Sequence, residues 1–404
     1  PALLLAALLI VPTSSQAFAA EPIRVGFMAP LTGIFSQAGR EMLEGLRLAF
    51  EQAGHQAAGR KIELIEEDDE GNPAKAIAKY RKLVSQDRIH VLTGILLANI
   101  GYGLIQPIER DQLPTLLFTT PDDLTKRRPS KWIARIFFSA SQPMHPLGDY
   151  AAKTLKYRAV ATIAMDNPFG HEQISGFQRV FEDGGGRVIQ KIWVPLNAMD
   201  FGPYLTQVKK DADAVCAVFT AGQAVRFVKQ YSDQGLKGKL PLIGSGTMVE
   251  EHVLRGMGDE AMGVIGALNW SPTLPNPTNR AFVQFAEAKL GKTPSFFHAA
   301  MYSAGRWVVE GAKLTEGRVE DRERFISALR SASGSTEDPR GPIKLDDYGN
   351  TTQNIYILRI DRAGGRLQNT VIHTYPLVSQ FWTYSPGEFL KSPAYSRDYP
   401  PVKP

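Results

Sequence analysis

The stretch "IRVGFMAPLTGIFSQAGREMLEGLRLAF", residues 23–50, decides the fold of this chain. It starts with a nearly continuous apolar run typical of a buried strand, passes through a polar loop that contains a glycine, and enters a helix. Five apolar residues of that helix fall on one stripe: Met42, Leu43, Leu46, Ala49 and Phe50. Because α/β proteins bind ligands at the carboxyl ends of their strands, we expect the loop to border a binding site.

The same alternation of strand and helix continues outward from this stretch in two groups. The first group runs to about residue 138, and the second repeats the plan from about residue 158 to 270. Near-continuous apolar strands separated by amphipathic helices indicate parallel sheets that are covered on both faces. The sequence therefore predicts an α/β protein with two doubly wound parallel-sheet lobes joined by a multi-strand hinge.

The remainder of the chain returns to both lobes. Two long amphipathic segments, at about 277–290 and 296–315, predict helices that cover the first sheet, and a pair of strands follows at 341–360. A chain that crosses between lobes several times forms a hinge that allows the lobes to close on a ligand. The predicted parts are a first lobe of residues 21–138 plus 269–346, a second lobe of residues 139–268 plus 347–375, and an extended tail of residues 376–404.

Composition and charge exclude several classes of protein. The 404 residues are 43% apolar and 22% charged, which is ordinary for a globular protein. The net charge of +5 is small for this length, so no nucleic-acid partner is expected. The one tight basic cluster, residues 125–131, is more typical of a solvated loop than of a phosphate-binding surface.

The first twenty residues indicate export. An apolar run from Ala2 to Val11 precedes the small-x-small pattern Ala17-Phe18-Ala19, which is typical of a signal-peptide cleavage site. The run is about half of the ~20 residues that span a bilayer, which favours a signal peptide at 1–20 over a retained anchor. Cys216 is the only cysteine, so no internal disulfide can form, and a bacterial periplasm suits an exported protein of this kind. We expect no stable membrane insertion after cleavage.

No catalytic group of residues stands out. The pair His171-Glu172 lacks a second histidine at metal-ligand spacing, and the glycines of residues 244–246 are too few for a phosphate-binding loop. The acidic run Glu66 to Glu70 leads into a helix N-terminus, where acidic residues are favourable without any metal. We therefore expect a protein that is not an enzyme and that has no metal and no cofactor.

Six stretches identify a family by their order and spacing. From Ile23 to about Ile360 the chain resembles the type I periplasmic solute-binding proteins of ABC transporters, in the branched-chain amino-acid-binding subfamily. The matching stretches are "VGFMAPLTGIFSQAGREMLEGLRLA" (25–49), "EEDDEGNPAKAIAKYRKLV" (66–84), "VLTGIL" (91–96), "LPTLLFTTPDDLT" (113–125), "MDNPFGHEQISGF" (165–177) and "YSDQGLKGKLPLIGSG" (231–246).

The resemblance implies a ligand held between the lobes, with its carboxylate bound by the first lobe. In this family, backbone N–H groups and hydroxyl groups at helix N-termini bind the carboxylate, which the positive end of the helix dipole favours. We expect Ala98 and Asn99 to contribute through backbone or amide contacts. Thr119 and Thr120 are expected to contribute their hydroxyl groups, although an N-cap cluster without a ligand is the alternative for these two residues.

Departures from the family pattern suggest the ligand class. Relatives that bind leucine-like ligands have Ser where this chain has Ala98, Tyr where it has Ala38, and an ammonium-binding Glu where it has Gly246. Because an ammonium group buried without an anion is costly, the missing Glu argues against an α-amino acid. One residue of error in the register would bring an acid back, since Glu250 and Glu251 follow closely. The other expected binding residues lie in three second-lobe loops: Phe169, Phe219, Thr220, Ala221, Ser245 and Thr247.

These features favour one function and leave alternatives. The favoured function is the capture of a small carboxylate, such as a benzoate or hydroxycinnamate derivative, by a monomeric periplasmic protein that delivers it to a membrane ABC permease. The branch of the family that binds aromatic acids resembles this chain in its Tyr- and Pro-rich tail. The alternatives are binding of a branched-chain amino acid or amide by the same fold, a ligand sensor for a signalling partner, and an enzyme that uses the same cleft.

Overall fold

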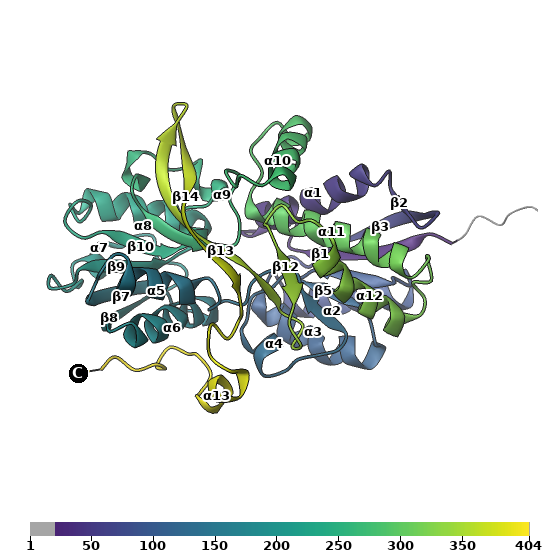
Figure 1. Ribbon diagram of the computed structural model, residues 1–404, viewed down its shortest axis with the longest axis horizontal. Helices are drawn as coiled ribbons and strands as arrows, with labels where there is room; N and C mark the ends of the chain where they lie inside the picture. The colour runs from purple at the N-terminus through teal and green to yellow at the C-terminus, as the bar shows by residue number, and fades with distance from the viewer. Residues whose placement is uncertain (1–20, 404) are drawn as a thin grey trace, which may run out of the picture.

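The computed structural model describes residues 21–403, so the predicted signal peptide at 1–20 lies outside the described residues. Within them the chain forms two sheets, each covered by helices, that lie side by side (Figure 1). We call the first sheet and its helices the first lobe, and the second sheet and its helices the second lobe. The predicted fold class, an α/β protein of two doubly wound lobes, is confirmed.

The first sheet is parallel apart from its short edge strand. Its order is β2-β3-β1-β4-β5-β6, and β1 pairs in parallel with β3 and β4 on its two sides. The strands are β1 (Ile23–Ala29), β2 (Gln56–Ala57), β3 (Arg60–Asp68), β4 (Val91–Gly94), β5 (Thr115–Leu117) and β6 (Ile133–Arg135). All four residues of β4 and all three of β5 are buried, as the continuous apolar runs predicted.

The helices of the first lobe come from both ends of the chain. They are α1 (Ser36–Gln52), α2 (Pro73–Ser85), α3 (Ala98–Asp111), α4 (Asp123–Lys126), α10 (Pro277–Leu290), α11 (Phe296–Leu314) and α12 (Arg322–Ser335). The predicted apolar stripe of the first helix is buried, and α1 packs along α11. Asn72 caps α2 by accepting from the N–H groups of Ala74 and Lys75, with Pro73 at the first helical position.

The second sheet has a parallel part and an antiparallel part. Its order is β12-β13-β11-β10-β9-β7-β8, with β14 on the other edge of β13. The strands are β7 (Ala159–Met165), β8 (Arg187–Val194), β9 (Ala214–Val218), β10 (Leu242–Ser245), β11 (Ile265–Leu268), β12 (Ile343–Leu345), β13 (Thr351–Ala363) and β14 (Arg366–Val378). The helices are α5 (Met144–Lys153), α6 (Pro168–Asp183), α7 (Gly202–Leu205), α8 (Ala221–Asp233), α9 (Glu251–Leu254) and the 3-10 turns η1 (Gly246–Met248) and η2 (Asp259–Ala261).

The strand β12 differs from its expected place. The sequence predicts that residues up to 346 belong to the first lobe, whereas β12 pairs antiparallel with β13 of the second sheet. The short turn at 346–350 explains the difference, because a chain that reverses within a few residues pairs with the strand that follows it. The side chain of Ile343 nevertheless packs in the core of the first lobe. This strand therefore belongs to the connection between the lobes.

Segments that connect the lobes are linked to one another by side-chain hydrogen bonds. Gln142 Nε2 donates to the Thr351 carbonyl at 2.7 Å, and Asn269 Nδ2 donates to Gln353 Oε1 at 2.9 Å. The guanidinium of Arg340, which is fully buried, donates to the Ile136 carbonyl. The first two bonds tie the crossings near residues 140 and 269 to β13, which runs through the middle of the molecule, and the third ties the crossing near residue 340 to the segment after β6 (Figure 1).

The first residues of the tail still belong to the second sheet. The sequence analysis expected an extended tail from residue 376, whereas β14 runs to Val378 and a short helix, α13 (Pro386–Lys391), follows. Phe381, Phe389 and Tyr395 form a small apolar cluster of their own. The last residues lie along α6, where Ser175 Oγ donates to the Tyr399 carbonyl at 2.8 Å (Figure 1).

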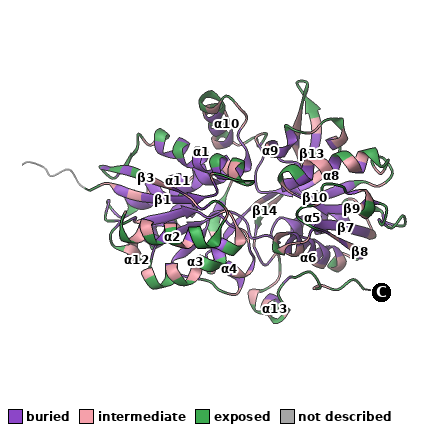
Figure 2. Cartoon of the chain, turned by 180° about the vertical axis from the view of Figure 1, so that it is seen from behind, coloured by how far each residue is buried: buried purple, intermediate pink, exposed green. Residues whose placement is uncertain are grey.

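Burial follows the layers of the fold. Most strands of both sheets are buried, whereas β14 is largely exposed or half-buried, and exposed residues also lie on the outer faces of the helices (Figure 2). Among residues 21–403 we find no helix with both the length and the apolar character needed to cross a membrane.

Candidate functional site between the lobes

A cavity of about 240 Å³ lies between the two lobes. Its first-lobe walls are the loops that follow β1, β4, β5 and β6, together with the start of α11. Its second-lobe walls are the loops that follow β7, β8, β9 and β10. The carboxyl ends of the parallel strands in both sheets therefore face one shared space, which is where open α/β sheets bind ligands.

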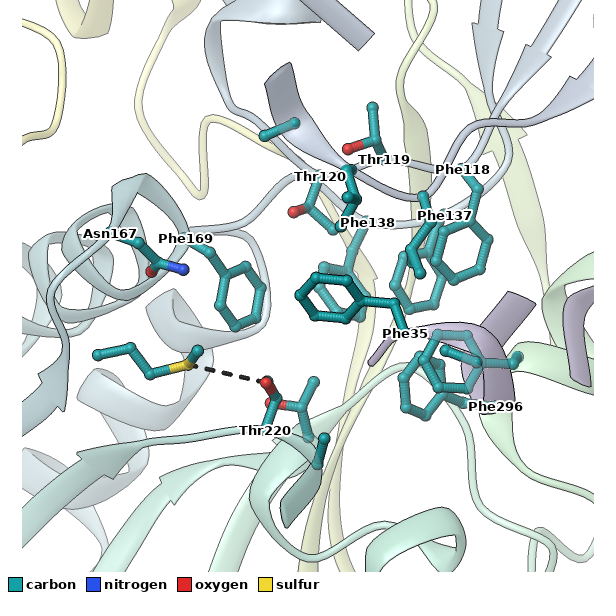
Figure 3. A pocket seen from close by; sticks show the side chains of 18 of the residues that line it. Phe35, Phe118, Thr119, Thr120, Phe137, Phe138, Asn167, Phe169, Thr220 and Phe296 are labelled. Atoms are coloured by element: carbon teal, nitrogen blue, oxygen red, sulfur yellow. Dashed lines mark hydrogen bonds between the residues drawn. The ribbon is translucent and has the colours of Figure 1, made fainter. Parts of the chain in front are cut away.

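Phenylalanine is the most frequent residue of the wall. Seven phenylalanines line the cavity: Phe35, Phe118, Phe137, Phe138, Phe169, Phe296 and Phe297. On the first-lobe side the rings of Phe118 and Phe137 stack with centroids 4.3 Å apart, and Phe296 stacks on Phe137 at 5.3 Å. Phe169 faces them from the second lobe (Figure 3). Such a wall favours a flat apolar body over a flexible polar one.

Phe35 lies at the mouth of this cavity. It belongs to the loop between β1 and α1, it lines the cavity, and it is still 37% exposed. Its ring projects among the other labelled side chains (Figure 3). The backbone N–H of Leu31 and the hydroxyl of Thr32 both bind Asp68, at 2.9 and 2.7 Å, and this holds the loop against the end of β3.

The first-lobe end of the cavity offers donors without a formal charge. Helix α3 starts at Ala98, which lines the cavity; its N-cap residue, Leu97, makes no side-chain hydrogen bond, and Asn99 Oδ1 occupies only the Ile100 N–H. Thr119 and Thr120 line the cavity beside it, and neither hydroxyl forms a hydrogen bond within residues 21–403. Free N–H groups, hydroxyl groups and the positive end of the helix dipole together favour a carboxylate.

A buried arginine lies behind the two threonines. Arg135 is fully buried, and it donates to the carbonyls of Thr120 at 3.0 Å and Pro121 at 2.6 Å. Burial lowers the pKa of Arg135 to about 10, while Asp122 and Glu172 oppose this effect, so the guanidinium stays charged at neutral pH. Its positive charge adds to the attraction for an anion at this end of the cavity.

Two further helices begin at the cavity from the second lobe. Asn167 caps α6 by accepting from the Gly170 N–H at 2.8 Å, and no side chain caps α8. Thr220 precedes α8 and directs its hydroxyl to the Met165 sulfur at 3.7 Å (Figure 3). Ala221 has φ of 49°, a left-handed conformation that is uncommon for alanine and that is found more often at functional sites.

An acidic residue and a histidine also line the cavity. Glu250 and His252 belong to the segment after β10, and His252 Nδ1 lies 3.0 Å from Glu41 Oε2 of the first lobe. Because Gly246 takes the place of the family's Glu, the sequence predicts a cleft without an acidic side chain. That expectation is wrong. The 3-10 turn that starts at Gly246 shifts the following residues along the wall, so Glu250 reaches the cavity.

The structure brings together eight of the twelve expected binding residues. Those that line the cavity are Ala38, Ala98, Thr119, Thr120, Phe169, Thr220, Ala221 and Thr247. The other four, Asn99, Phe219, Ser245 and Gly246, are not among the residues that line it.

Local contacts explain these four positions. Asn99 is exposed, and its side chain accepts from the Ile100 N–H at 3.0 Å. Phe219 packs in the second-lobe core against Phe227, with ring centroids 4.4 Å apart. Ser245 Oγ lies 2.8 Å from Thr247 Oγ1 and caps the turn that Gly246 starts.

Sequence reasoning missed most of the aromatic wall. The missed residues that line the cavity are Phe35, Leu96, Leu97, Phe118, Phe137, Phe138, Met165, Asn167, Pro168, Leu196, Glu250, His252, Phe296 and Phe297. Phe118 belongs to a stretch that carries the family resemblance, so its place directly after β5 was a usable signal. Nothing in the periodicity separates Phe137, Phe296 or Phe297 from ordinary core residues.

The titratable residues do not form a metal centre. Within residues 21–403, no group of three or more His, Cys, Asp or Glu side chains could hold a metal ion. Cys216 is fully buried in β9, and burial raises the pKa of its thiol far above the usual range, so it is not a reactive nucleophile.

The chain is similar to known solute-binding proteins over most of its length. A Leu/Ile/Val-binding protein homologue from Brucella melitensis is 25% identical over 381 residues, which cover 92% of this chain and 96% of the relative. A leucine-, isoleucine-, valine-, threonine- and alanine-binding protein from Pseudomonas aeruginosa is 24% identical over 86% of this chain and 91% of its own.

Solved structures with the same fold include complexes with aromatic acids. An ABC transporter substrate-binding protein from Sphaerobacter thermophilus is 32% identical with a TM-score of 0.86, and the match covers 89% of this chain and 99% of that one. A solute-binding protein from Rhodopseudomonas palustris BisB5, solved with 3,4-dihydroxybenzoic acid, is 30% identical with a TM-score of 0.81, covering 89% and 98%. One from R. palustris, solved with benzoate, is 27% identical with a TM-score of 0.80, covering 89% and 97%.

The family itself follows from the largest match. The profile of the family described as "Periplasmic binding protein" matches residues 22–366, most of the chain. The structural neighbours that share this fold are substrate-binding proteins of ABC transporters and not enzymes. The chain belongs to the periplasmic binding protein family, with the type I fold of the Leu/Ile/Val-binding and benzoate-binding substrate-binding proteins of ABC transporters.

Proposed function

We propose that this protein is the periplasmic substrate-binding component of an ABC transporter, and that it captures an aromatic carboxylate and delivers it to a membrane permease. The observation that carries the proposal is the composition of the interlobe cavity. Seven phenylalanines surround a space whose first-lobe end presents uncapped helix N–H groups and two threonine hydroxyls. A flat ring with one carboxylate matches both parts of this wall.

Two separate contributions to the free energy favour binding of an aromatic acid. Transfer of an apolar ring from water into the phenylalanine wall is favourable by about 25 cal/mol per Å² of buried apolar surface. The carboxylate exchanges its hydration for N–H and O–H donors that are already in place, with Arg135 behind them. The helix dipole of α3 also stabilises a carboxylate at the first-lobe end of the cavity. The ligand therefore needs no fully charged partner in direct contact.

Contacts between the lobes on two sides of the cavity support a closing mechanism. The Asp122 N–H of the first lobe donates to Glu172 Oε2 of the second lobe at 3.1 Å. On the other side, His252 meets Glu41, and Arg255 Nη2 donates to the Thr293 carbonyl at 2.6 Å. A ligand that touches both lobes shifts the protein toward the form in which these contacts exist, and that form is the one a permease would recognise.

One experiment tests the ligand class. The mature protein is titrated calorimetrically with benzoate, 4-hydroxybenzoate and a hydroxycinnamate, and in parallel with leucine, isoleucine and valine. The proposal expects saturable one-site binding of at least one aromatic acid and no heat with the amino acids. Binding of leucine alone would overturn it.

A second candidate, an amino-acid receptor, rests on Glu250. An ionised carboxylate in the cavity wall is the partner that a ligand ammonium group requires. The names of the curated relatives point in the same direction. We favour the aromatic acid because the wall is built of phenylalanines and because the structures at 27 and 30% identity were solved with benzoate-type ligands.

A further inference from the structure

Glu250 is buried in the cavity wall without a full set of partners. Its side chain is 2% exposed, and Oε2 accepts from the His252 N–H at 2.9 Å. Oε1 forms no hydrogen bond to any residue between 21 and 403. Oε1 is not among the fully buried polar atoms that lack a partner, so its surface is open to the cavity that Glu250 lines. Because Glu250 lines the ligand cavity, the missing partner is to be sought in the ligand.

The protonation state of Glu250 narrows what that partner can be. Burial raises the pKa of Glu250 well above its usual range; the charges of Glu251 and Glu41 add to this, while the His252 N–H and Arg255 oppose it. Burial therefore favours the neutral carboxylic acid, the form that has one O–H donor and a carbonyl acceptor.

His252 supplies a second polar group beside it. Burial alone would raise the pKa of Glu41, but the hydrogen bond from His252, the charges of His298 and His252 and the hydrogen bond from Ser295 lower it to about 2. An ionised Glu41 accepts hydrogen bonds only, so Nδ1 of His252 must carry a proton. The other ring nitrogen, Nε2, forms no hydrogen bond within the described chain and accepts one when the ring is neutral.

An aromatic wall connects these two groups to the carboxylate end. The ring of Phe118, next to Thr119, lies 5.7 Å from the ring of Phe297. The Phe297 ring in turn lies 5.7 Å from the imidazole of His252. Polar groups therefore stand at both ends of a continuous apolar surface. Helix N-termini and Arg135 lie at one end, and Glu41, which Arg255 and Lys292 approach at 3.7 and 3.8 Å, lies at the other.

We infer that Glu250 and His252 form a hydroxyl-recognition site, and that the ligand is an aromatic acid with a phenolic hydroxyl on the ring, away from its carboxylate. A phenol hydroxyl can donate to Nε2 of a neutral His252 or accept from the Nε2–H of a charged one, and its oxygen also accepts from the Glu250 O–H. The inference rests on the proposed function and deepens it.

Calorimetry with matched ligands tests the site. Wild-type protein is titrated with benzoate, 3-hydroxybenzoate and 4-hydroxybenzoate. Two added hydrogen bonds predict that at least one hydroxybenzoate binds about tenfold more tightly than benzoate. In Glu250→Met this preference falls to about twofold or less, whereas Glu250→Gln, which keeps a donor and an acceptor, retains most of it.

The neighbouring residue provides the control. Glu251 is also buried, but it accepts from Asn369 Nδ2 at 2.8 Å and does not line the cavity. Glu251→Gln should leave the hydroxyl preference unchanged. Circular dichroism and thermal melting check that each variant is folded.

The outcomes separate the inference from the proposed function. If benzoate binds but wild type shows no hydroxyl preference, or if Glu250→Met keeps it, the inference is overturned and the proposed function stands. The wild-type comparison decides this even if Glu250→Met does not fold. If no aromatic acid binds and leucine does, and if Glu250→Gln abolishes leucine binding, then Glu250 pairs with an ammonium group. In that case the inference and the proposed function are both overturned.

Discussion

Lys126 Nζ lies 2.7 Å from Asp122 Oδ2, and the two side chains are only 2% and 5% exposed. The same ammonium group donates to Ser141 Oγ at 2.6 Å, and Asp122 Oδ1 accepts from the Ser141 N–H at 3.1 Å. The ring of Phe389, from the tail helix α13, covers the ammonium group at 4.7 Å. This ion pair therefore joins the first lobe, a segment that crosses between the lobes, and the tail.

Replacing only one partner of this pair should be costly. Lys126→Met leaves Asp122 charged and buried without its cation, so we expect a loss of about 3–5 kcal/mol in the free energy of unfolding. Urea unfolding followed by circular dichroism measures it. The double variant Lys126→Met/Asp122→Asn, which keeps an acceptor for the Ser141 N–H, should recover part of the loss. A loss below about 1 kcal/mol in the single variant would show that the pair contributes little.

The tail should contribute to stability through its aromatic cluster. Phe389 is 4% exposed, and it packs against Phe381 and the guanidinium of Arg179. Phe389→Ala should lower the free energy of unfolding by about 2 kcal/mol, because a buried phenylalanine side chain is lost. Thermal melting compares it with Leu377→Ala, whose side chain is 42% exposed. Equal melting temperatures for Phe389→Ala and wild type would mean that the tail cluster does not stabilise the fold.

The two threonines should bind the ligand carboxylate. Thr119→Val and Thr120→Val keep the shape of the side chain and remove the hydroxyl group. Each should weaken binding of an aromatic acid about tenfold, since one hydrogen bond to a charged group is lost. Calorimetric titration measures Kd. Thr154→Val, at an exposed position after α5, is the control. If both cavity variants bind as tightly as wild type, the anion site is elsewhere.

Phe169 should contribute to the binding of the ring. It lines the cavity from the second lobe and is only partly buried, so its removal leaves the core intact. Phe169→Ala should weaken binding by about 2 kcal/mol, which is about thirtyfold in Kd. Phe285→Ala, at a partly buried position on α10 outside the cavity, should bind like wild type. Similar affinities for the two variants would argue against an aromatic slot.

Asp69 should make stability depend on pH. It is fully buried, Oδ1 accepts from the Gly71 N–H at 2.8 Å, and Oδ2 has no partner among the described residues. Burial raises the pKa of Asp69 to about 6, the Gly71 hydrogen bond opposes this, and the charge of Asp68 adds to it. The folded protein thus binds this proton more tightly than the unfolded chain, whose aspartates have a pKa of about 3.9.

The sign of the effect follows from that difference. The stability that protonated Asp69 provides is fully present below about pH 3.9 and is lost as the pH rises through about 6. Asp69→Asn is neutral throughout, so it should be more stable than wild type by about 2 kcal/mol at pH 7.5, with little difference near pH 4. Urea unfolding across this range measures it. A wild type that is the more stable of the two at pH 7.5 would contradict the prediction.

The sequence by itself determined the two lobes and the family. Continuous apolar strands and amphipathic helices alternate because strands buried on both faces and half-buried helices impose different hydrophobic periods. The helices at 277–290 and 296–314 were predicted almost to the residue, since each has a turn before it and an apolar stripe within it. Thr119 and Thr120 were found because they follow a buried strand and precede a helix.

Only the tertiary structure decided the composition of the cavity. Phe137, Phe296 and Glu250 are far apart in the chain, and they meet because the carboxyl ends of two sheets face each other. Hydrophobic period shows that a phenylalanine is buried, but a core and a ligand cavity bury it equally well. The 3-10 turn at Gly246 places Glu250 in the wall, and such a local turn changes which residue faces the cavity without changing the pattern of strands and helices.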